Sequence, residues 1–359
     1  MIVCRPNAPS LLPRLAALVA ALALAGGVAR ADQASEALLK YQEPVDEAID
    51  RALRFLAEHQ EKDGFFESRH MRRNTAITSL CVMAFLAKGY TPGNEPYGDV
   101  IDRGIDAVLD SLQHNGMLVG SSRSHGPMYS HTISTLMLSE VSGMVSPERQ
   151  RKLDEALAKA LRVILAAQDV RKHRNHQGGW RYQHNSRDSD ISCTGWAIMS
   201  LRSARNNGAA VPRDAIEDGI RFVLNCRRRD GGFGYQPGGG SGLARTGTAL
   251  LCLELCGHHG KRETKDAGNW ILGHLPRNRH ENFFYYGIYY TSQGMFQLGE
   301  DFWETFGDHM YKLLLREQRD DGSWPEGDGN ERRAGRCYST AMAVLAMSVA
   351  YRQLPIYQR

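Results

Sequence analysis

The chain has 359 residues, of which 42% are apolar and 23% are charged, and its formal net charge is +4. This composition is ordinary for a globular protein and supplies enough apolar side chains to fill a core. The small net charge gives no electrostatic reason to expect a nucleic-acid partner. The basic run at residues 227–229 is better explained as a solvated surface turn.

The first 31 residues have the features of a secretory signal peptide. Arg5 and Arg14 precede an apolar run at residues 15–25, and Ala29-Arg30-Ala31 offers a small-x-small cleavage site. The run is too short to span a membrane comfortably. We therefore expect cleavage near Ala31 and an exported mature protein, periplasmic or secreted, without a transmembrane span; an uncleaved N-terminal anchor is the alternative. Cleavage would remove three of the 44 basic residues and leave 41 against 40 acidic ones.

A unit of about fifty residues repeats along the rest of the chain. Each copy has an apolar helix, a turn with Gly and an aromatic residue, and a second apolar helix. In the best copies a Gln ends the first helix: Gln60, Gln168 and Gln318, followed in the last two by Trp180 and Trp324. The six copies lie near residues 49–90, 101–143, 154–205, 214–257, 264–299 and 302–352. Such a repeat predicts an array of helical hairpins.

The two helices of each copy differ in character. The second helices contain few charged residues and are expected near residues 75–86, 131–141, 192–204, 246–255, 290–298 and 339–351. A helix that is apolar on all sides is buried, whereas the two-faced first helices belong outside. We therefore predict an all-α fold, an (α/α)6 barrel of six hairpins at residues 45–352. A signal peptide (1–31) and a short linker (32–44) would precede the barrel, and a tail (353–359) would follow it.

The Gln followed by Gly-x-Trp or Gly-x-Phe resembles the QW motif of squalene-hopene and oxidosqualene cyclases. The related prenyltransferase β-subunits share the same α/α toroid. The chain also looks like the short exported bacterial proteins with prenyltransferase and squalene oxidase repeats, and the resemblance covers residues 45–352. It implies a terpene-cyclase-like toroid around a central cavity. Full triterpene cyclases carry two such barrel domains, and only one is present in this sequence.

The repeated motif also has a structural interpretation. A Gln amide can donate to backbone carbonyls near a helix end, Gly permits a tight turn, and an aromatic ring can cover the next helix. We expect Gln60, Gln168, Gln318, Trp180 and Trp324 to join neighbouring outer helices rather than to act on a ligand.

Candidate catalytic residues stand at the start of two inner helices. Asp188-Ser189-Asp190 partly matches the Asp-x-Asp-Asp acid of class II cyclases, but Ile191 replaces the third Asp. In the catalytic interpretation Asp190 is a buried acid with a raised pKa. In the structural interpretation Asp190 is a helix N-cap, and its pKa is lowered. His131 is the third candidate, with a hydrogen-bonded wall residue as the alternative.

Aromatic residues near the same barrel end are candidate ligand contacts, because ring faces stabilise cations. The predicted ligand-binding residues are Tyr129, Trp196, Tyr286, Tyr290, Tyr338 and Arg245. We expect no metal and no cofactor. Cys252 and Cys256 with the neighbouring His258 and His259 fit no standard zinc spacing, and most of the six mature cysteines should be free buried thiols.

These observations leave two main hypotheses for function. The first is a terpene-cyclase-like protein that binds, and in its catalytic form transforms, an apolar polyprenyl-type ligand. If it is an enzyme, it is a class II-like isomerase or lyase with an incomplete motif. The second is a secreted, non-catalytic binding or scaffold protein on the same toroid, with an unknown protein partner. A glycan-cleaving enzyme is a third possibility and would need paired carboxylates across the barrel mouth.

Overall fold

The computed structural model describes residues 35–120 and 126–357, so the predicted signal peptide lies outside the described residues. Within these ranges the chain is helical, without a strand. Six outer helices are α2 (Glu36–Glu58), α4 (Gly98–Leu109), α6 (Pro147–Asp169), α8 (Arg213–Asn225), α10 (Arg262–Leu272) and α12 (Glu300–Glu317). Six inner helices are α3 (Thr75–Ala87), α5 (Pro127–Glu140), α7 (Ile191–Asn206), α9 (Leu243–Leu255), α11 (Phe284–Leu298) and α14 (Arg336–Met347). A four-residue helix, α13 (Glu331–Ala334), precedes α14.

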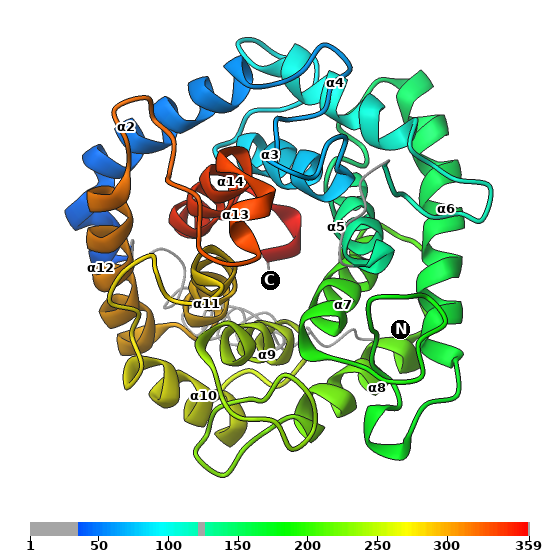
Figure 1. Ribbon diagram of the computed structural model, residues 1–359, viewed down its shortest axis with the longest axis vertical. Helices are drawn as coiled ribbons and strands as arrows, with labels where there is room; N and C mark the ends of the chain where they lie inside the picture. Colours follow the sequence, from blue (N-terminus) through cyan, green and yellow to red (C-terminus); the bar gives the residue numbers. More distant parts are fainter. Residues whose placement is uncertain (1–34, 121–125, 358–359) are drawn as a thin grey trace, which may run out of the picture.

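The two sets form concentric rings, which Figure 1 shows in a view along the barrel. The inner helices are buried on nearly every side: in α3 all thirteen residues except Ala76 are buried. Outer helices bury one face, as in α8, where Ile220 and Phe222 are buried and Arg221 is exposed. The predicted (α/α)6 barrel is therefore confirmed, since side-chain polarity alone separates the rings.

The repeated Gln residues tie each unit to the next. Gln168 Nε2 donates to the turn carbonyl of Gly178 at 2.7 Å and to Ala215 O of the next outer helix at 2.8 Å. Gln60 makes the same pair of bonds to Gly64 O and Val100 O. Gln318 bonds Gly322 O and, across the ring closure, Ala48 O. The expected link between outer helices is present, although the amide reaches the following unit rather than the end of its own helix.

Gln168 is free to bond the next unit because another side chain satisfies the carbonyls at the end of α6. Lys172 Nζ donates to the carbonyls of Ala167, Gln168 and Val170 at 2.8–3.2 Å. These bonds satisfy acceptors that a helix C-terminus leaves open. Burial of the amine lowers the pKa of Lys172 to about 8.

The turn glycines and the tryptophans complete the contact between neighbouring units, which we call the joint. Gly178 has φ +85°, and a Cβ there would lie 2.4 Å from Asp218 O of the next outer helix, so no other residue fits. Trp180 is buried, its Nε1 donates to Ile164 O at 2.7 Å, and its backbone N–H donates to Thr194 Oγ1 at 3.0 Å. Trp324 repeats both bonds with Leu314 O and Thr340 Oγ1.

Two boundary predictions are wrong. Residues 36–44, predicted as part of a linker, are the first turns of α2, because they close the ring against α12. Glu304 Oε2 accepts from Ala37 N at 2.6 Å, and Trp303 Nε1 donates to Ser35 Oγ at 2.7 Å.

Residues 355–357, predicted as a tail, form a 3₁₀ turn (Pro355–Tyr357) whose Ile356 is buried. Four inner helices begin several residues before their predicted starts at 131, 246, 290 and 339: α5 at Pro127, α9 at Leu243, α11 at Phe284 and α14 at Arg336. The apolar pattern alone does not mark their first turns.

None of the helices in the described ranges has the length and hydropathy needed to cross a membrane. The six cysteines in those ranges form no disulfide, and all except the half-buried Cys256 are buried, as expected for free thiols in apolar helices.

Candidate functional site

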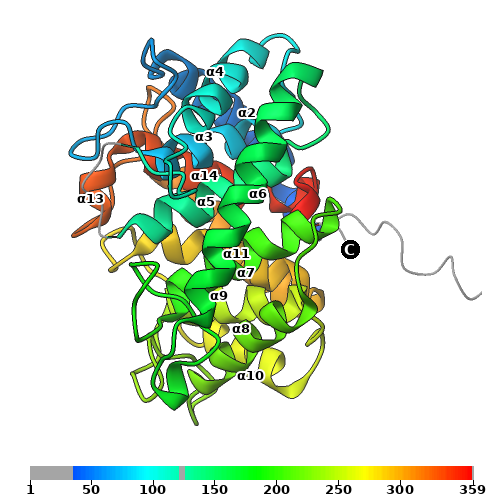
Figure 2. The same cartoon turned by 90° about the vertical axis from the view of Figure 1, so that its right-hand side faces the viewer.

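A central cavity of about 560 Å³ lies inside the inner ring at the end where α13 sits. Figure 2 shows α13 projecting from this end of the barrel. Apolar wall residues are Met71, Ala76, Ile77, Leu80, Ile133, Ala244, Phe283, Ala334 and Met342. Aromatic wall residues with a polar tip are Tyr129, Tyr182, Trp196, Tyr235, Tyr286 and Tyr338. The other wall residues are Asn74, Ser130, Ser192, Arg245, Asn330, Glu331 and Arg333.

Five of the six predicted ligand-binding residues line this cavity: Tyr129, Trp196, Tyr286, Tyr338 and Arg245. Arg245 is held by a 2.8 Å bond from Nη1 to Gly240 O. Tyr290 is not part of the wall, so that prediction is wrong. It lies behind Trp196, with ring centroids 5.1 Å apart, because it occupies a buried position one turn beyond Tyr286 on α11.

Trp196 is the centre of the aromatic cluster. Its ring stacks on Tyr289 with centroids 5.5 Å apart and meets Tyr286 edge-on at 6.4 Å. Trp196 is buried, and its Nε1 has no hydrogen-bond partner among the described residues. A buried donor at a cavity wall without a partner is unusual, because it loses its bond to water without replacement.

Glu331 is the only acidic residue among the described residues that line the cavity. It is buried, and its carboxylate accepts from Tyr286 N at 2.9 Å, from Tyr285 N at 3.3 Å and from Tyr338 Oη at 3.2 Å. It thus caps the start of α11 from a different element. Burial raises the pKa of Glu331 to about 7, against the lowering effect of these hydrogen bonds.

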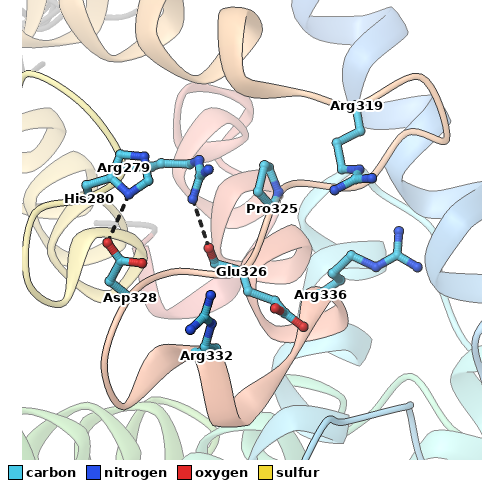
Figure 3. Close-up of a pocket in the computed structure, with 8 residues that line it drawn as sticks. All are labelled: Arg279, His280, Arg319, Pro325, Glu326, Asp328, Arg332 and Arg336. Atoms are coloured by element: carbon cyan, nitrogen blue, oxygen red, sulfur yellow. Dashed lines mark hydrogen bonds and ion pairs between the residues drawn. The ribbon is translucent and has the colours of Figure 1, made fainter.

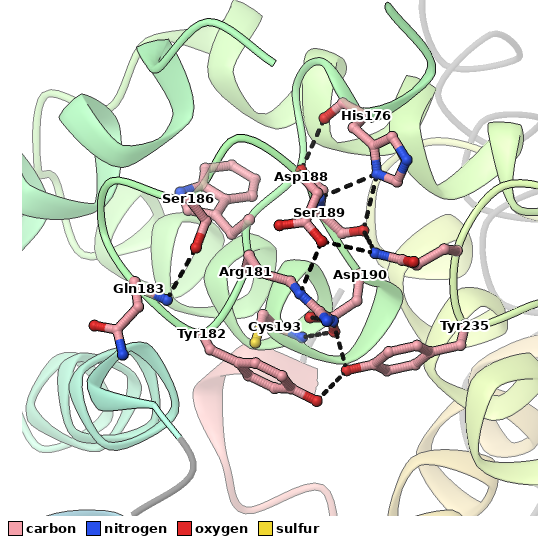
Figure 4. A network of polar contacts seen from close by, with 12 residues as sticks. His176, Arg181, Tyr182, Gln183, Ser186, Asp188, Ser189, Asp190, Cys193 and Tyr235 are labelled. Atoms are coloured by element: carbon pink, nitrogen blue, oxygen red, sulfur yellow. Dashed lines mark hydrogen bonds and ion pairs between the residues drawn. The ribbon is translucent and has the colours of Figure 1, made fainter. Parts of the chain in front are cut away.

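The Asp pair lies next to the cavity but not in its wall. Asp190 caps α7: its Oδ1 accepts from Ser192 N and Cys193 N, both at 2.9 Å. Its Oδ2 binds Arg181 Nη1 at 2.9 Å, and Asp188 Oδ2 lies 3.2 Å from Arg181 Nε. Figure 4 shows Arg181 held between the two carboxylates and above Tyr182 and Tyr235. The pair therefore positions an arginine and, through it, two tyrosines of the cavity wall.

The expected link between cap geometry and a lowered pKa is wrong for Asp190. Its carboxylate makes the cap bonds, yet burial raises the pKa of Asp190. The bonds from Cys193 and Arg181 oppose this effect only in part. Sequence reasoning missed that a cap residue can be fully buried, so the direction of its pKa shift does not separate the two interpretations.

His131 is buried and does not line the cavity. Leu118 N donates to its Nδ1 at 3.1 Å, so Nδ1 carries no proton, and Nε2–H donates to Ala160 O at 3.1 Å. Burial lowers the pKa of His131 to about 4. Both nitrogens are engaged with backbone, which contradicts the catalytic interpretation of this residue in favour of its structural alternative.

Tyr182, Tyr235 and Glu331 are the cavity residues with the clearest chemical role among those that were not predicted from the sequence. Tyr182 and Tyr235 follow the Gly-aromatic turns of their units, a position that could have identified them. Glu331 lies in a charged stretch at residues 326–333 that is typical of a solvent-exposed loop, and no pattern marks it as buried.

The family model described as "Prenyltransferase alpha-alpha toroid domain" matches residues 31–281. A terpene cyclase-glycosyl transferase fusion protein of Humicola fuscoatra is 26% identical over 204 residues. Enfumafungin synthase of Hormonema carpetanum is 28% identical over 196 residues. Each alignment covers 52% of this chain and 14% of the relative, so the chain spans a small part of those proteins.

Solved structures share the fold. A variant of the type II terpene cyclase MstE from Scytonema, in complex with merosterolic acid A, has a TM-score of 0.55 at 14% identity and covers 88% of this chain and 100% of its own. The GH76 α-mannanase of Bacteroides thetaiotaomicron has a TM-score of 0.62 at 11% identity and covers 88% and 99%. Identities this low show a common architecture and nothing about shared chemistry.

Proposed function

The chain belongs to the prenyltransferase α-α toroid domain family, and we propose that it binds an apolar, polyprenyl-type ligand in its central cavity. The observation that carries this proposal is the wall itself. Aliphatic side chains from α3, α5 and α14 face aromatic rings from α7 and α11 across about 560 Å³. Cavities of this size with mainly apolar walls and few polar groups are typical small-molecule sites.

The proposal extends to chemistry at Glu331. A buried carboxyl with a pKa near 7 is partly protonated at neutral pH. It could transfer its proton to a carbon of a ligand double bond, and the rings of Trp196 and Tyr286 would face the resulting carbocation. Loss of a proton from a neighbouring carbon to the Glu331 carboxylate would end the reaction as an isomerisation. No other reactant is required.

A non-catalytic binding protein is the second candidate, and a specific observation favours it. The backbone N–H groups of Tyr285 and Tyr286 donate to Glu331, as they would to a carboxylate that serves only as a helix cap, and the Tyr338 hydroxyl adds a further bond. The Asp188–Asp190 pair is likewise engaged with Arg181. Export of the mature chain, expected from residues 1–31, is compatible with both candidates.

A glycosidase role has less support, although a mannanase shares the architecture. Glycoside hydrolysis generally uses two carboxylates placed about 5–10 Å apart across the bond. Among the described wall residues only Glu331 is acidic.

Binding can be tested with squalene and farnesol, with tryptophan fluorescence as the signal. Ala76→Trp and Ile133→Trp fill the cavity from α3 and α5, and Leu39→Trp adds the same side chain at an exposed position of α2. Saturable binding by the parent and by Leu39→Trp, reduced about tenfold or more in both filled variants, supports the proposal. Equal binding by all four proteins, with unchanged melting temperatures, would contradict it.

Chemistry is tested separately with Glu331→Gln, which keeps the size of the side chain. The catalytic form predicts that this variant binds squalene or farnesol like the parent but yields no rearranged product. The non-catalytic form predicts that the parent itself returns the ligand unchanged after prolonged incubation, as judged by mass and chromatographic retention.

A further inference from the structure

We propose that an arginine-lined cleft, separate from the central cavity, binds a doubly charged oxyanion such as a phosphate or sulfate group. The cleft has a volume of about 400 Å³. Its walls are Arg279, His280, Arg319, Pro325, Glu326, Asp328, Arg332 and Arg336. None of these eight residues lines the apolar cavity, so the inference does not depend on the function proposed above.

Three separate segments bring the four arginines together. Arg279 comes from the connection between α10 and α11, Arg319 follows α12, and Arg332 and Arg336 belong to α13 and α14. Figure 3 shows Arg319 and Arg332 on opposite sides of the Pro325–Glu326 segment. Residues so distant in the chain meet here only because the last two hairpins fold against each other.

Most charges around the cleft are already matched. Arg279 Nε lies 3.4 Å from Glu317, Arg336 Nη1 lies 2.5 Å from Asp321, and His280 Nδ1 lies 2.9 Å from Asp328. The carboxylate of Glu326 binds Arg69 Nη1 at 2.8 Å from outside the cleft. These pairs hold two of the guanidinium groups in place.

Arg319 and Arg332 are the exceptions. Neither forms an ion pair with any other described residue, and both are exposed. Two guanidinium groups therefore have no ion pair beside others that are already fixed, and the one described wall carboxylate without a basic Lys or Arg partner is Asp328, which is bonded to the His280 ring. A phosphate or sulfate group has several oxygens and so can bond more than one guanidinium group of this wall, and the planar fork of Arg suits their geometry.

The lining also argues against other ligands. The cleft contains no aromatic residue except His280, which is engaged with Asp328, so it offers no platform for stacking a base. Pro325 is the only apolar residue in the wall, so the cleft cannot bury an apolar group. A small oxyanion, either free or as an ester on a larger molecule, fits what is left.

The experiment uses the full chain and calorimetric titration at constant ionic strength with inorganic phosphate, inorganic sulfate and glucose 6-phosphate. Sodium chloride and sodium acetate are the monoanion controls. The test variant is Arg319→Gln with Arg332→Gln. The matched control is Arg151→Gln with Arg162→Gln, two exposed arginines of α6 that also form no ion pair with a described residue.

We expect saturable binding of at least one dianion by the parent and the control, weakened about tenfold or more in the test variant. Binding of inorganic phosphate or sulfate indicates a free ion as the source, and binding of glucose 6-phosphate alone indicates an ester. Equal effects of chloride, equal losses in the control variant, or no saturable heat with any dianion would overturn the proposal. Melting temperatures of both double variants establish that the proteins remain folded.

Discussion

The backbone N–H of Ile356 donates a 3.0 Å hydrogen bond to Glu140 Oε2, and this bond joins residues 216 positions apart. Glu140 ends the inner helix α5 and is buried, and its Oε1 also accepts from Ser203 Oγ of α7. Arg202 Nη1 donates to Ile356 O at 2.6 Å. The buried carboxyl of Glu140 thus holds the C-terminal turn against the inner helices α5 and α7. Glu140 is the last residue of α5, whereas the first residues of that helix lie beside the cavity.

This carboxyl should make stability depend on pH. Burial raises the pKa of Glu140 to about 7 from the ordinary 4.5. The folded state therefore holds a proton that the unfolded state releases between about pH 4.5 and 7. Stability falls as pH rises through this window and is flat above it. Glu140→Gln can still accept from Ile356 N and donate to Ser203. It should reduce the change in the free energy of unfolding across this pH window by about 3 kcal/mol. Urea unfolding at pH 5 and pH 8 measures it.

The comparison must be made as a difference between parent and variant, because Glu331 has a similar raised pKa and contributes in the same direction. Leu39→Gln on the exposed face of α2 is the control substitution. A pH dependence that is identical in the parent and in Glu140→Gln would show that Glu140 titrates normally.

The joint between units gives a second prediction. Gln168→Ala removes two hydrogen bonds and leaves Gly178 O and Ala215 O without their donor, and it should lower the free energy of unfolding by about 2–4 kcal/mol. Gln113 is the matched control, because its exposed amide bonds only Val119 O within its own unit. Gln113→Ala should change stability by less than about 1 kcal/mol. Similar losses for the two variants in chemical denaturation would reject the inter-unit role.

Trp180→Ala tests the aromatic half of the same joint. The side chain is fully buried, and its removal should cost about 3–5 kcal/mol. Trp270 is only partly buried, and its Nε1 makes a 3.3 Å bond to Asp230, so Trp270→Ala should cost clearly less. Calorimetric melting of the two variants checks the ranking. A Trp180→Ala protein that melts like its parent would contradict the structural role of the motif.

The sequence was sufficient for the architecture because the signal for it is repeated. Six hairpins, two polarity classes and the Gln-Gly-aromatic joint each occur several times, so an error in one copy does not change the count. The first and last residues of an individual helix are marked only once in the sequence, so they are harder to predict. The first turn of α2 is bonded to α12 through Ala37 and Glu304, which are 267 positions apart in the chain, and no local pattern shows that contact.

The candidate site was harder to predict for a related reason. Trp196 and Tyr286 could be placed because they lie on inner helices whose inward face is known. Asp190 caps α7 and His131 lies one turn into α5, but their partners Arg181, Leu118 and Ala160 come from other segments. Glu331 was missed because its burial depends on the helix α11 that it caps.

His131 supplies a prediction of opposite sign to that for Glu140. Burial lowers its pKa to about 4 from 6.5, so the neutral ring contributes stability above pH 6.5 that is lost as pH falls through 4. The full effect is about 3 kcal/mol. Nitrogen NMR of labelled histidine should show one ring that remains neutral, with its proton on Nε2, to about pH 4. A His131 signal that titrates near 6.5 would contradict the backbone bonds described for both nitrogens.

Asp190 provides the last prediction, because it separates a structural carboxylate from a catalytic one. Asn is a good N-cap, so Asp190→Asn should keep the bonds from Ser192 N and Cys193 N. Its amide would, however, face Arg181 Nη1, now 2.9 Å from a carboxylate oxygen. Breaking a largely buried ion pair leaves a charge without its partner, and we expect a loss of about 2–4 kcal/mol.

The loss should be accompanied by looser Tyr182 and Tyr235 rings, visible as faster ring flipping by NMR, since Arg181 lies over both rings. Arg181→Met should reproduce much of this effect, because it leaves Asp190 buried without its cation. An Asp190→Asn variant that keeps full stability but no longer turns over a polyene substrate would instead make Asp190 the acid, in preference to Glu331.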